Sequence, residues 1–94
     1  MRQNTAAYLA NGVRMNAIAP GYIATPLNEK IESDPEMRNT NQAFAASIPG
    51  GRKGHPDDIS RAAVFLLASE SSFIAGTVLF LDGGQDALIR PDNF

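Results

Sequence analysis

The sequence predicts an α/β fold built around a parallel sheet, with this chain forming the end of a larger domain. Two apolar segments, Val13–Ala19 and Thr77–Leu81, are typical of strands that helices cover on both faces. A helical pattern at Arg2–Ala10, a tight turn at positions 11 and 12 and the first of these strands form half of a right-handed crossover unit. Two strands alone are marginal in water, because an independent sheet usually needs three or more. We therefore expect further strands to complete the sheet.

The first half of the chain predicts a helix, a strand, a loop and two more helices. Good helix formers fill Arg2–Ala10, and the Asn-Gly pair at positions 11 and 12 tolerates the left-handed conformation that ends a helix. The strand at Val13–Ala19 follows, and a loop runs from Gly21 to Pro26. The polar stretch Leu27–Ser47, with scattered apolar residues, predicts two short helices with a break near Asp34.

The second half predicts one long helix and one strand. Pro56 needs no backbone donor in a first helical turn, and Asp57 and Asp58 face the positive end of the helix dipole. The apolar residues of this helix recur at helical spacing and predict one buried stripe, made of Ile59, Ala62, Ala63, Leu66 and Leu67. The strand closes at Asp-Gly-Gly, positions 82–84, and residues 85–94 show no clear period.

Composition excludes several classes of protein. The 94 residues hold 8 Lys+Arg and 10 Asp+Glu, a net charge of −2, whereas a general nucleic-acid binder carries a basic stripe. Without cysteine there is no disulfide or thiolate metal site, and one histidine cannot form a multi-histidine site. The longest apolar run, Ala62–Ala68, is far shorter than the ~20 residues of a membrane span. We expect a cytoplasmic chain with no nucleic-acid or membrane partner.

Four motifs, in order along nearly the whole chain, resemble the short-chain dehydrogenase/reductase family. They are Asn16–Gly21, Thr25–Leu27, Gly51–Ile59, and Gly76-Thr77 followed by Asp82–Gly84. The ending Asp86–Phe94 resembles the 3α-hydroxysteroid dehydrogenase/carbonyl reductase-like branch. The resemblance implies the C-terminal part of a Rossmann-like doubly wound parallel sheet, comprising its last two strands, the substrate-loop helices and the final long helix.

The resemblance also implies a function. The family transfers hydride between NAD or NADP and a secondary alcohol or ketone, here a steroid-like or other carbonyl compound. By position, the loop that meets the nicotinamide half of the cofactor contributes Pro20, Gly21, Ile23 and Thr25. Residues 27–48 would form the substrate lid, and the final helix and strand would form the interface of a homo-oligomer, a dimer or tetramer.

Two features of the family are missing from these residues. There is no glycine-rich turn for a pyrophosphate, and no tyrosine followed four positions later by lysine. Tyr8 is followed at that spacing by Gly12, and Tyr22 by Pro26, so no catalytic residue is assigned. We expect residues 1–94 to be the C-terminal fragment of a single domain, with Met1 either an internal methionine or an artificial start, and with the isolated chain inactive. The alternatives are a non-catalytic assembly or binding fragment and a truncated remnant.

Several candidate residues have a structural interpretation beside the functional one. The segment Pro20–Thr25 is also typical of an ordinary turn. Arg52 and Lys53 could attract an anion, but a solvated loop pair is favoured. His55 directly precedes a proline that starts a helix, which favours a capping or loop residue over a general base. Asp57 and Asp58 lie in the first turn of the same helix, and this position explains them without acid/base chemistry. In the predicted lid, Ile31, Met37 and Phe44 could line an apolar pocket, or they could form the buried side of surface helices. The sequence favours neither interpretation.

Overall fold

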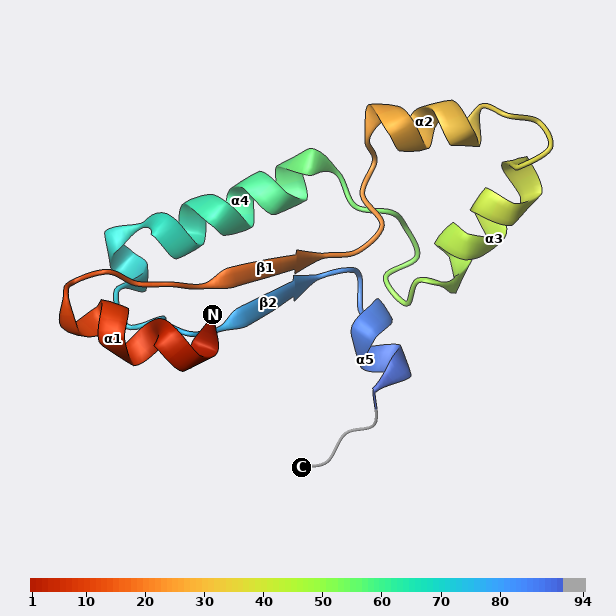
Figure 1. Ribbon diagram of the computed structural model, residues 1–94. Helices are drawn as coiled ribbons and strands as arrows, with labels where there is room; N and C mark the ends of the chain where they lie inside the picture. The colour runs from red at the N-terminus through yellow and green to blue at the C-terminus, as the bar shows by residue number, and fades with distance from the viewer. Residues whose placement is uncertain (91–94) are drawn as a thin grey trace.

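The two predicted strands lie side by side and in parallel in the computed structural model, which describes residues 1–90 (Figure 1). Their register pairs Ala17 with Val78 and Pro20 with Leu81. In chain order the elements are a 3-10 turn (Arg2–Asn4), α1 (Thr5–Ala10), β1 (Ala17–Pro20), α2 (Pro26–Glu32), α3 (Arg38–Ser47), α4 (Pro56–Leu67), a second 3-10 turn (Ser69–Ser71), β2 (Val78–Leu81) and α5 (Gln85–Ile89). The α/β class and the parallel pairing are confirmed.

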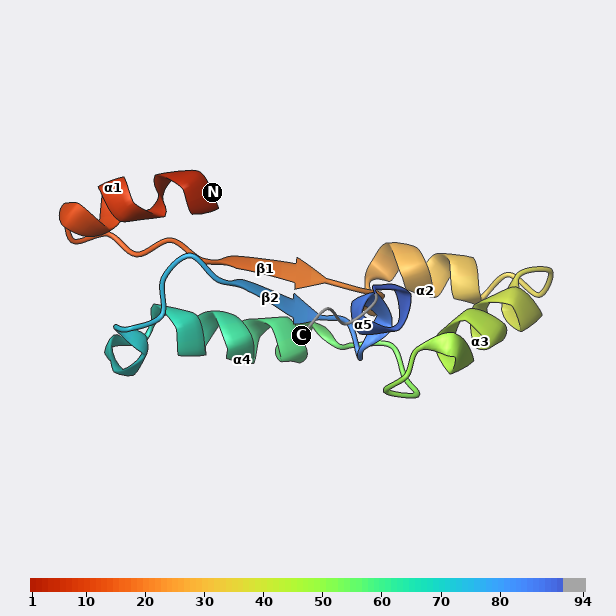
Figure 2. The same ribbon diagram turned by 90° about the horizontal axis from the view of Figure 1, so that it is seen from below.

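Helices lie on both sides of the strand pair. In Figure 2, α4 runs along one side of β1 and β2, whereas α1 lies on the opposite side, near the beginning of the strands. The chain leaves β1, passes through α2, α3 and α4, and returns to the neighbouring strand β2. This layering is that of an α/β sheet with crossover helices.

The first strand is shorter than predicted and shifted along the chain. The ladder covers Ala17–Pro20 rather than Val13–Ala19. Before it, the Gly76 N–H donates to the Met15 carbonyl at 2.8 Å, and the Asn16 side chain adds to this backbone contact: its Oδ1 accepts from the Thr77 N–H at 3.1 Å, and its Nδ2 donates to the Ile74 carbonyl at 3.1 Å. These side-chain hydrogen bonds hold the two segments together where the regular ladder has not yet begun.

The strands are half-buried, not buried on both faces as predicted. Phe80 in β2 is 47% exposed, and the buried apolar residues among those described are Ile48 and Leu66. In α4 the predicted stripe holds for Leu66, but Leu67 is 82% exposed. The radius of gyration is 16.6 Å, against ~12 Å for a compact domain of this length. Within the described residues, these strands and helices therefore share little common core.

The two short helices of the polar stretch are confirmed as α2 and α3. The break between them is a turn at residues 33–37, where the Asp34 carboxylate accepts the Glu36 N–H at 3.0 Å and its carbonyl accepts the Met37 N–H at 3.0 Å. We call residues 26–47 the arm. It extends away from the sheet, and neither of its helices contains a buried residue (Figure 1).

A fifth helix was not predicted. The residues after β2 form α5, and the Asp82 side chain caps it: Oδ1 accepts the Gly84 N–H at 3.0 Å and Oδ2 accepts the Asp86 N–H at 2.8 Å. Asp82 lies two residues before Gly84, the N-cap residue of α5, and its oxygens satisfy backbone donors that the start of a helix leaves free. Residues 91–94, part of the ending that resembles the hydroxysteroid dehydrogenase branch, lie outside the described residues.

Candidate functional site

The predicted loop begins where both strands end. Because β1 and β2 are parallel, their carboxyl ends meet at the same edge of the sheet, which is where ligands bind in open α/β folds. The Gly21 N–H donates to the Leu81 carbonyl at 3.0 Å and so ties the start of the loop to the end of β2. The loop therefore leaves the sheet at a fixed point.

Gly21 lies too close to the neighbouring chain for any side chain. A Cβ atom on Gly21 would lie 2.6 Å from the Asp82 Cβ and 2.8 Å from its Cα. Asp82 cannot move easily, since its carboxylate caps α5. Glycine at position 21 thus allows close backbone packing between the loop and the turn that follows β2.

We expect Gly21→Ala to destabilise the full-length protein that carries this segment by about 1–3 kcal/mol, as overpacking of a tight contact does. The matched control is Gly54→Ala, whose Cβ would lie 2.7 Å from the Cδ1 end of the flexible Ile23 side chain and at ordinary contact distances of 3.6 and 3.7 Å from Asp58 Oδ2 and the Tyr22 carbonyl oxygen. Urea unfolding of both variants measures the difference. Equal losses in the two variants would contradict the close approach of Gly21 and Asp82.

Ile23 presents an unused backbone donor. Its neighbours form the contacts with Gly54: the Tyr22 carbonyl accepts the Gly54 N–H at 2.8 Å, and the Ala24 N–H donates to the Gly54 carbonyl at 2.9 Å. In this parallel pairing the N–H and C=O of Ile23 point to the opposite edge. The C=O accepts the Asn28 side-chain amide, and the N–H has no partner among residues 1–90.

Thr25 has a structural role that the sequence analysis did not assign. It is the N-cap of α2, and its Oγ1 accepts the Asn28 N–H at 3.2 Å. Capping uses the hydroxyl as an acceptor, so its hydrogen is still available to donate. The hydroxyl can therefore cap the helix and bind a ligand oxygen at the same time.

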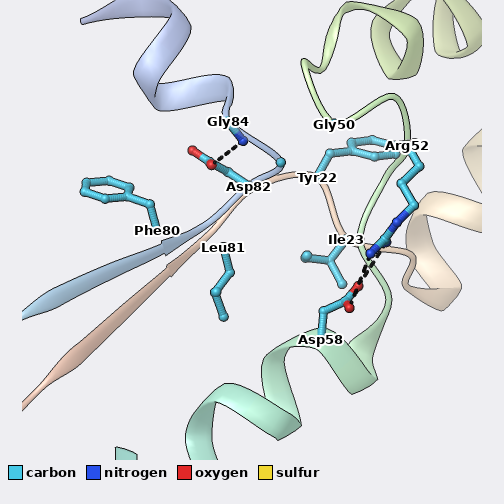
Figure 3. A pocket seen from close by; sticks show the side chains of 11 residues that line it. Tyr22, Ile23, Gly50, Arg52, Asp58, Phe80, Leu81, Asp82 and Gly84 are labelled. Carbon is cyan, nitrogen blue, oxygen red and sulfur yellow. Dashed lines mark hydrogen bonds and ion pairs between the residues drawn. The ribbon is translucent and has the colours of Figure 1, made fainter. Parts of the chain in front are cut away.

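The four predicted cofactor residues lie in one loop, but they do not line one pocket. Pro20 and Gly21 line a hollow of about 240 Å³ beside α5. Ile23 lines a larger pocket of about 500 Å³ on the side of α4, together with Tyr22 and the glycines at 50, 54, 83 and 84 (Figure 3). Thr25 lines neither. The loop thus separates two concave regions at the edge of the sheet.

Arg52 is exposed, as the sequence analysis favoured, since 60% of its side chain is accessible, and it is also paired. Its Nη1 lies 3.0 Å from Asp58 Oδ2 in the first turn of α4, and the same oxygen accepts the His55 N–H at 2.8 Å. The Arg52 guanidinium, together with the backbone hydrogen bond from His55, lowers the pKa of Asp58 to about 2. The carboxylate is held in place by these contacts, which confirms the structural interpretation of His55 and Asp58.

Lys53 is also paired, and its partner lies in the arm. Lys53 Nζ contacts the Glu32 carboxylate at the C-terminal end of α2, and the Tyr22 hydroxyl donates to the other oxygen of Glu32. The hydrogen bond to Glu32 raises the pKa of Tyr22 above its ordinary value. A raised pKa is the opposite of what a general base requires near neutral pH, so Tyr22 is unsuited to that role.

The apolar residues predicted for the lid do not line either pocket at the edge of the sheet. Ile31, Met37 and Phe44 are 42%, 39% and 42% exposed. The Phe44 ring packs against the Tyr22 ring, with 5.2 Å between centroids and a tilt of 60°. These residues lie on the partly exposed surface of the arm.

The fold has a parallel sheet with helices on both sides and a loop at its carboxyl edge. Open α/β proteins of this class bind ligands, including dinucleotides, at that edge. Residues 1–86 match the family model described as Enoyl-(Acyl carrier protein) reductase. This match, together with the relatives below, shows that the chain belongs to the short-chain dehydrogenase/reductase family. The predicted resemblance is confirmed.

Two curated relatives are hydroxysteroid dehydrogenases. The chain is 43% identical over 78 residues to 3beta-hydroxysteroid dehydrogenase 1 of Eggerthella lenta, covering 83% of the chain and 29% of the relative. It is 35% identical over 94 residues to 3-alpha-hydroxysteroid dehydrogenase/carbonyl reductase of Comamonas testosteroni, covering 100% and 36%. The chain thus spans about a third of the length of these relatives.

Two solved structures show the same fold. The 3-alpha-hydroxysteroid dehydrogenase of Pseudomonas sp. B-0831, in complex with NADH, superposes with a TM-score of 0.78 at 41% identity, covering 99% of this chain and 36% of that one. A structure from Agrobacterium tumefaciens with bound NADP has a TM-score of 0.79 at 40% identity, covering 92% and 34%. Both nicotinamide cofactors are therefore found among the structural relatives.

Among residues 1–90, no helix combines the length and apolar character needed to cross a membrane.

Proposed function

We propose that residues 1–94 are the C-terminal part of a single-domain, NAD(P)-dependent oxidoreductase that acts on a secondary alcohol or ketone. The observation that carries the proposal is the loop Pro20–Thr25 at the carboxyl edge of the parallel strands, with the Ile23 N–H unpartnered among residues 1–90. The family membership and the relatives that bind NADH or NADP support it. A cytoplasmic location is part of the same proposal.

Each loop residue has a separate task in this function. The nicotinamide ring, when bound, accepts or delivers the hydride. The Ile23 N–H donates to the carboxamide, and the Thr25 hydroxyl donates to the carboxamide or to a phosphate oxygen while it caps α2. Pro20 and Gly21 bring the backbone to the ring, because Gly21 allows the close approach to Asp82. The loop binds and orients, and the proton is handled by residues outside this segment.

The arm is proposed to cover the substrate. Its exposed apolar side chains include Leu27, Ile31, Met37 and Phe44. A partly exposed apolar surface beside a cofactor loop suits a bulky apolar alcohol or ketone, because small-molecule sites are mostly lined by such side chains. The hydroxysteroid dehydrogenases among the relatives are consistent with a steroid-like substrate.

An assembly role is the second candidate function. It is favoured by the apolar surface of α4, where Val64 and Phe65 are 68% and 55% exposed. In this alternative the segment joins dehydrogenase subunits and takes no part in cofactor binding. Measuring cofactor affinity after changing the loop separates the two functions.

We expect Thr25→Ala, in the full-length protein, to raise the dissociation constant for the cofactor about 2- to 12-fold, as losing one hydrogen bond of ~0.5–1.5 kcal/mol would. Loss of the N-cap of α2 is expected to cost about 1 kcal/mol of stability as well. Calorimetric titration with NAD and NADP, with thermal melting of the same samples, measures both effects.

Two further variants separate capping from cofactor binding. Thr25→Asp keeps a capping oxygen but, as a carboxylate, has no hydrogen to donate, so we expect normal stability with weakened cofactor binding. Thr25→Ser keeps both the capping oxygen and the donor and should resemble the unmodified protein. A dissociation constant that stays unchanged in Thr25→Ala and Thr25→Asp would reduce Thr25 to a purely structural residue.

A further inference from the structure

The arm is held by few contacts. None of its helical residues is buried, and it projects away from the strand pair in both views (Figures 1 and 2). At the N-terminal end of the arm, Thr25 caps α2 and the Asn28 side-chain amide donates to the Ile23 carbonyl. At its C-terminal end, Ile48 is buried just after α3. An element with so little buried apolar surface opens at low free-energy cost. Its orientation must therefore depend on a few specific side chains.

Tyr22 makes contact with both helices of the arm. Its hydroxyl donates to Glu32 at the end of α2, and its ring packs at 5.2 Å on Phe44 of α3. The second oxygen of Glu32 accepts from Lys53, in the segment before α4. The side chains of Glu32 and Lys53 are 24% and 29% exposed, so solvent screens this pair only in part. We call these contacts the Tyr22 network.

The backbone that carries Tyr22 is firmly fixed. Gly21 is bonded to the Leu81 carbonyl at the end of β2, and the Tyr22 carbonyl accepts the Gly54 N–H at 2.8 Å. Tyr22 also lies between two predicted cofactor residues, Gly21 and Ile23. The Tyr22 side chain therefore extends from a fixed backbone and contacts an arm that has few other contacts. It does so at the position where the loop would meet the nicotinamide.

We propose that Tyr22 is a positioning residue, which sets the orientation of the arm over the carboxyl edge of the sheet through Glu32, Lys53 and Phe44. This inference rests on the proposed function, because it assigns the arm to the substrate side of the same site. The network contacts the arm and not the cofactor donors at Ile23 and Thr25. Its loss therefore affects the affinity for the alcohol or ketone and leaves the affinity for NAD(P) unchanged.

The first test follows the arm by limited proteolysis of the full-length protein. Lys30 and Arg38 are trypsin sites within the arm. We expect Tyr22→Phe, which keeps the ring and removes the hydroxyl, to increase the cleavage rate at both sites about fivefold. The matched control is Tyr8→Phe in α1. Cleavage of Tyr22→Phe at the unmodified rate, or an equal increase in Tyr8→Phe, would overturn the role of the network. This readout does not depend on any enzymatic activity.

The second test uses a double-mutant cycle with steady-state kinetics. Tyr22→Phe and Glu32→Ala should each raise KM for the alcohol about fivefold, with the cofactor dissociation constant unchanged. Alanine leaves no acceptor for the Tyr22 hydroxyl, so the double variant should be no worse than Glu32→Ala alone. Additive effects, or an unchanged KM, would overturn the positioning role. If the unmodified protein turns over no alcohol with NAD or NADP, the proposed function is contradicted. The proteolysis result would still decide whether Tyr22 orients the arm, because it does not depend on activity.

Discussion

The 94-residue chain, produced alone, is expected to turn over no secondary alcohol with NAD or NADP above the rate of a heat-denatured control. Hydride transfer requires two reactants held in register and a proton acceptor within reach. The chain contributes the loop that we propose to orient the nicotinamide, but neither of its tyrosines, Tyr8 and Tyr22, has a lysine four residues later. It therefore lacks the acid/base pair that the family pattern uses.

The structure gives a separate reason why each tyrosine is unsuited to act as the acid/base residue. Tyr8 lies in α1, which is on the opposite side of the strands from α4, and its side chain is 46% exposed (Figure 2). Tyr22 donates its hydroxyl to the Glu32 carboxylate, and this hydrogen bond raises its pKa. A phenol whose pKa is raised gives up its proton less readily, so Tyr22 cannot replace the missing base near neutral pH.

The measurement is the change in NADH or NADPH absorbance with a panel of secondary alcohols and ketones. Circular dichroism of the same preparation shows whether the chain is folded. Turnover by the folded chain would contradict the assignment of acid/base chemistry to residues outside the segment. The Tyr8→Phe and Tyr22→Phe variants would then identify which phenol is responsible.

Most of the fold could be predicted because its elements have strong local signals. Pro56 followed by two aspartates marks the start of α4, and Asn-Gly at positions 11 and 12 marks the end of α1. The start of β1 was misplaced because Asn16 pairs with Thr77 through its side chain, a contact across 61 residues. The helix α5 was missed because it has only five residues, too few to show a period.

The position of the candidate loop in the fold could be predicted, but the electrostatic contacts around it could not. The loop at Pro20–Thr25 follows a strand in the sequence, so its position at the edge of the sheet could be inferred. The ion pair of Lys53 with Glu32 joins residues 21 positions apart, and the role of Tyr22 depends on that same contact. Such pairings depend on how the arm folds back, which no local pattern encodes.

We propose that the full-length protein forms a homo-oligomer through α4, and Phe65→Asp is expected to dissociate it into smaller species. On α4, Phe65 is 55% and Val64 68% exposed, off the stripe that Leu66 buries. A helix that is apolar on most sides is usually buried on most sides, so this second face is proposed to pack against another copy. A symmetric contact places the patch against itself, and one substitution then introduces two unpaired carboxylates, which are costly to bury.

Sedimentation velocity of the unmodified protein and the variant measures the effect. Phe65→Leu, which keeps the residue apolar, should sediment like the unmodified protein. Leu27→Asp places the same charge on the equally accessible arm, where the side chain is 68% exposed, and should leave the oligomer intact. If Phe65→Asp is folded by circular dichroism and still sediments as the original oligomer, this face of α4 is not the contact. The exposed apolar residues of α4 would then have to pack against other parts of the same protein, because a surface of this kind is rarely left open to water in a soluble monomer.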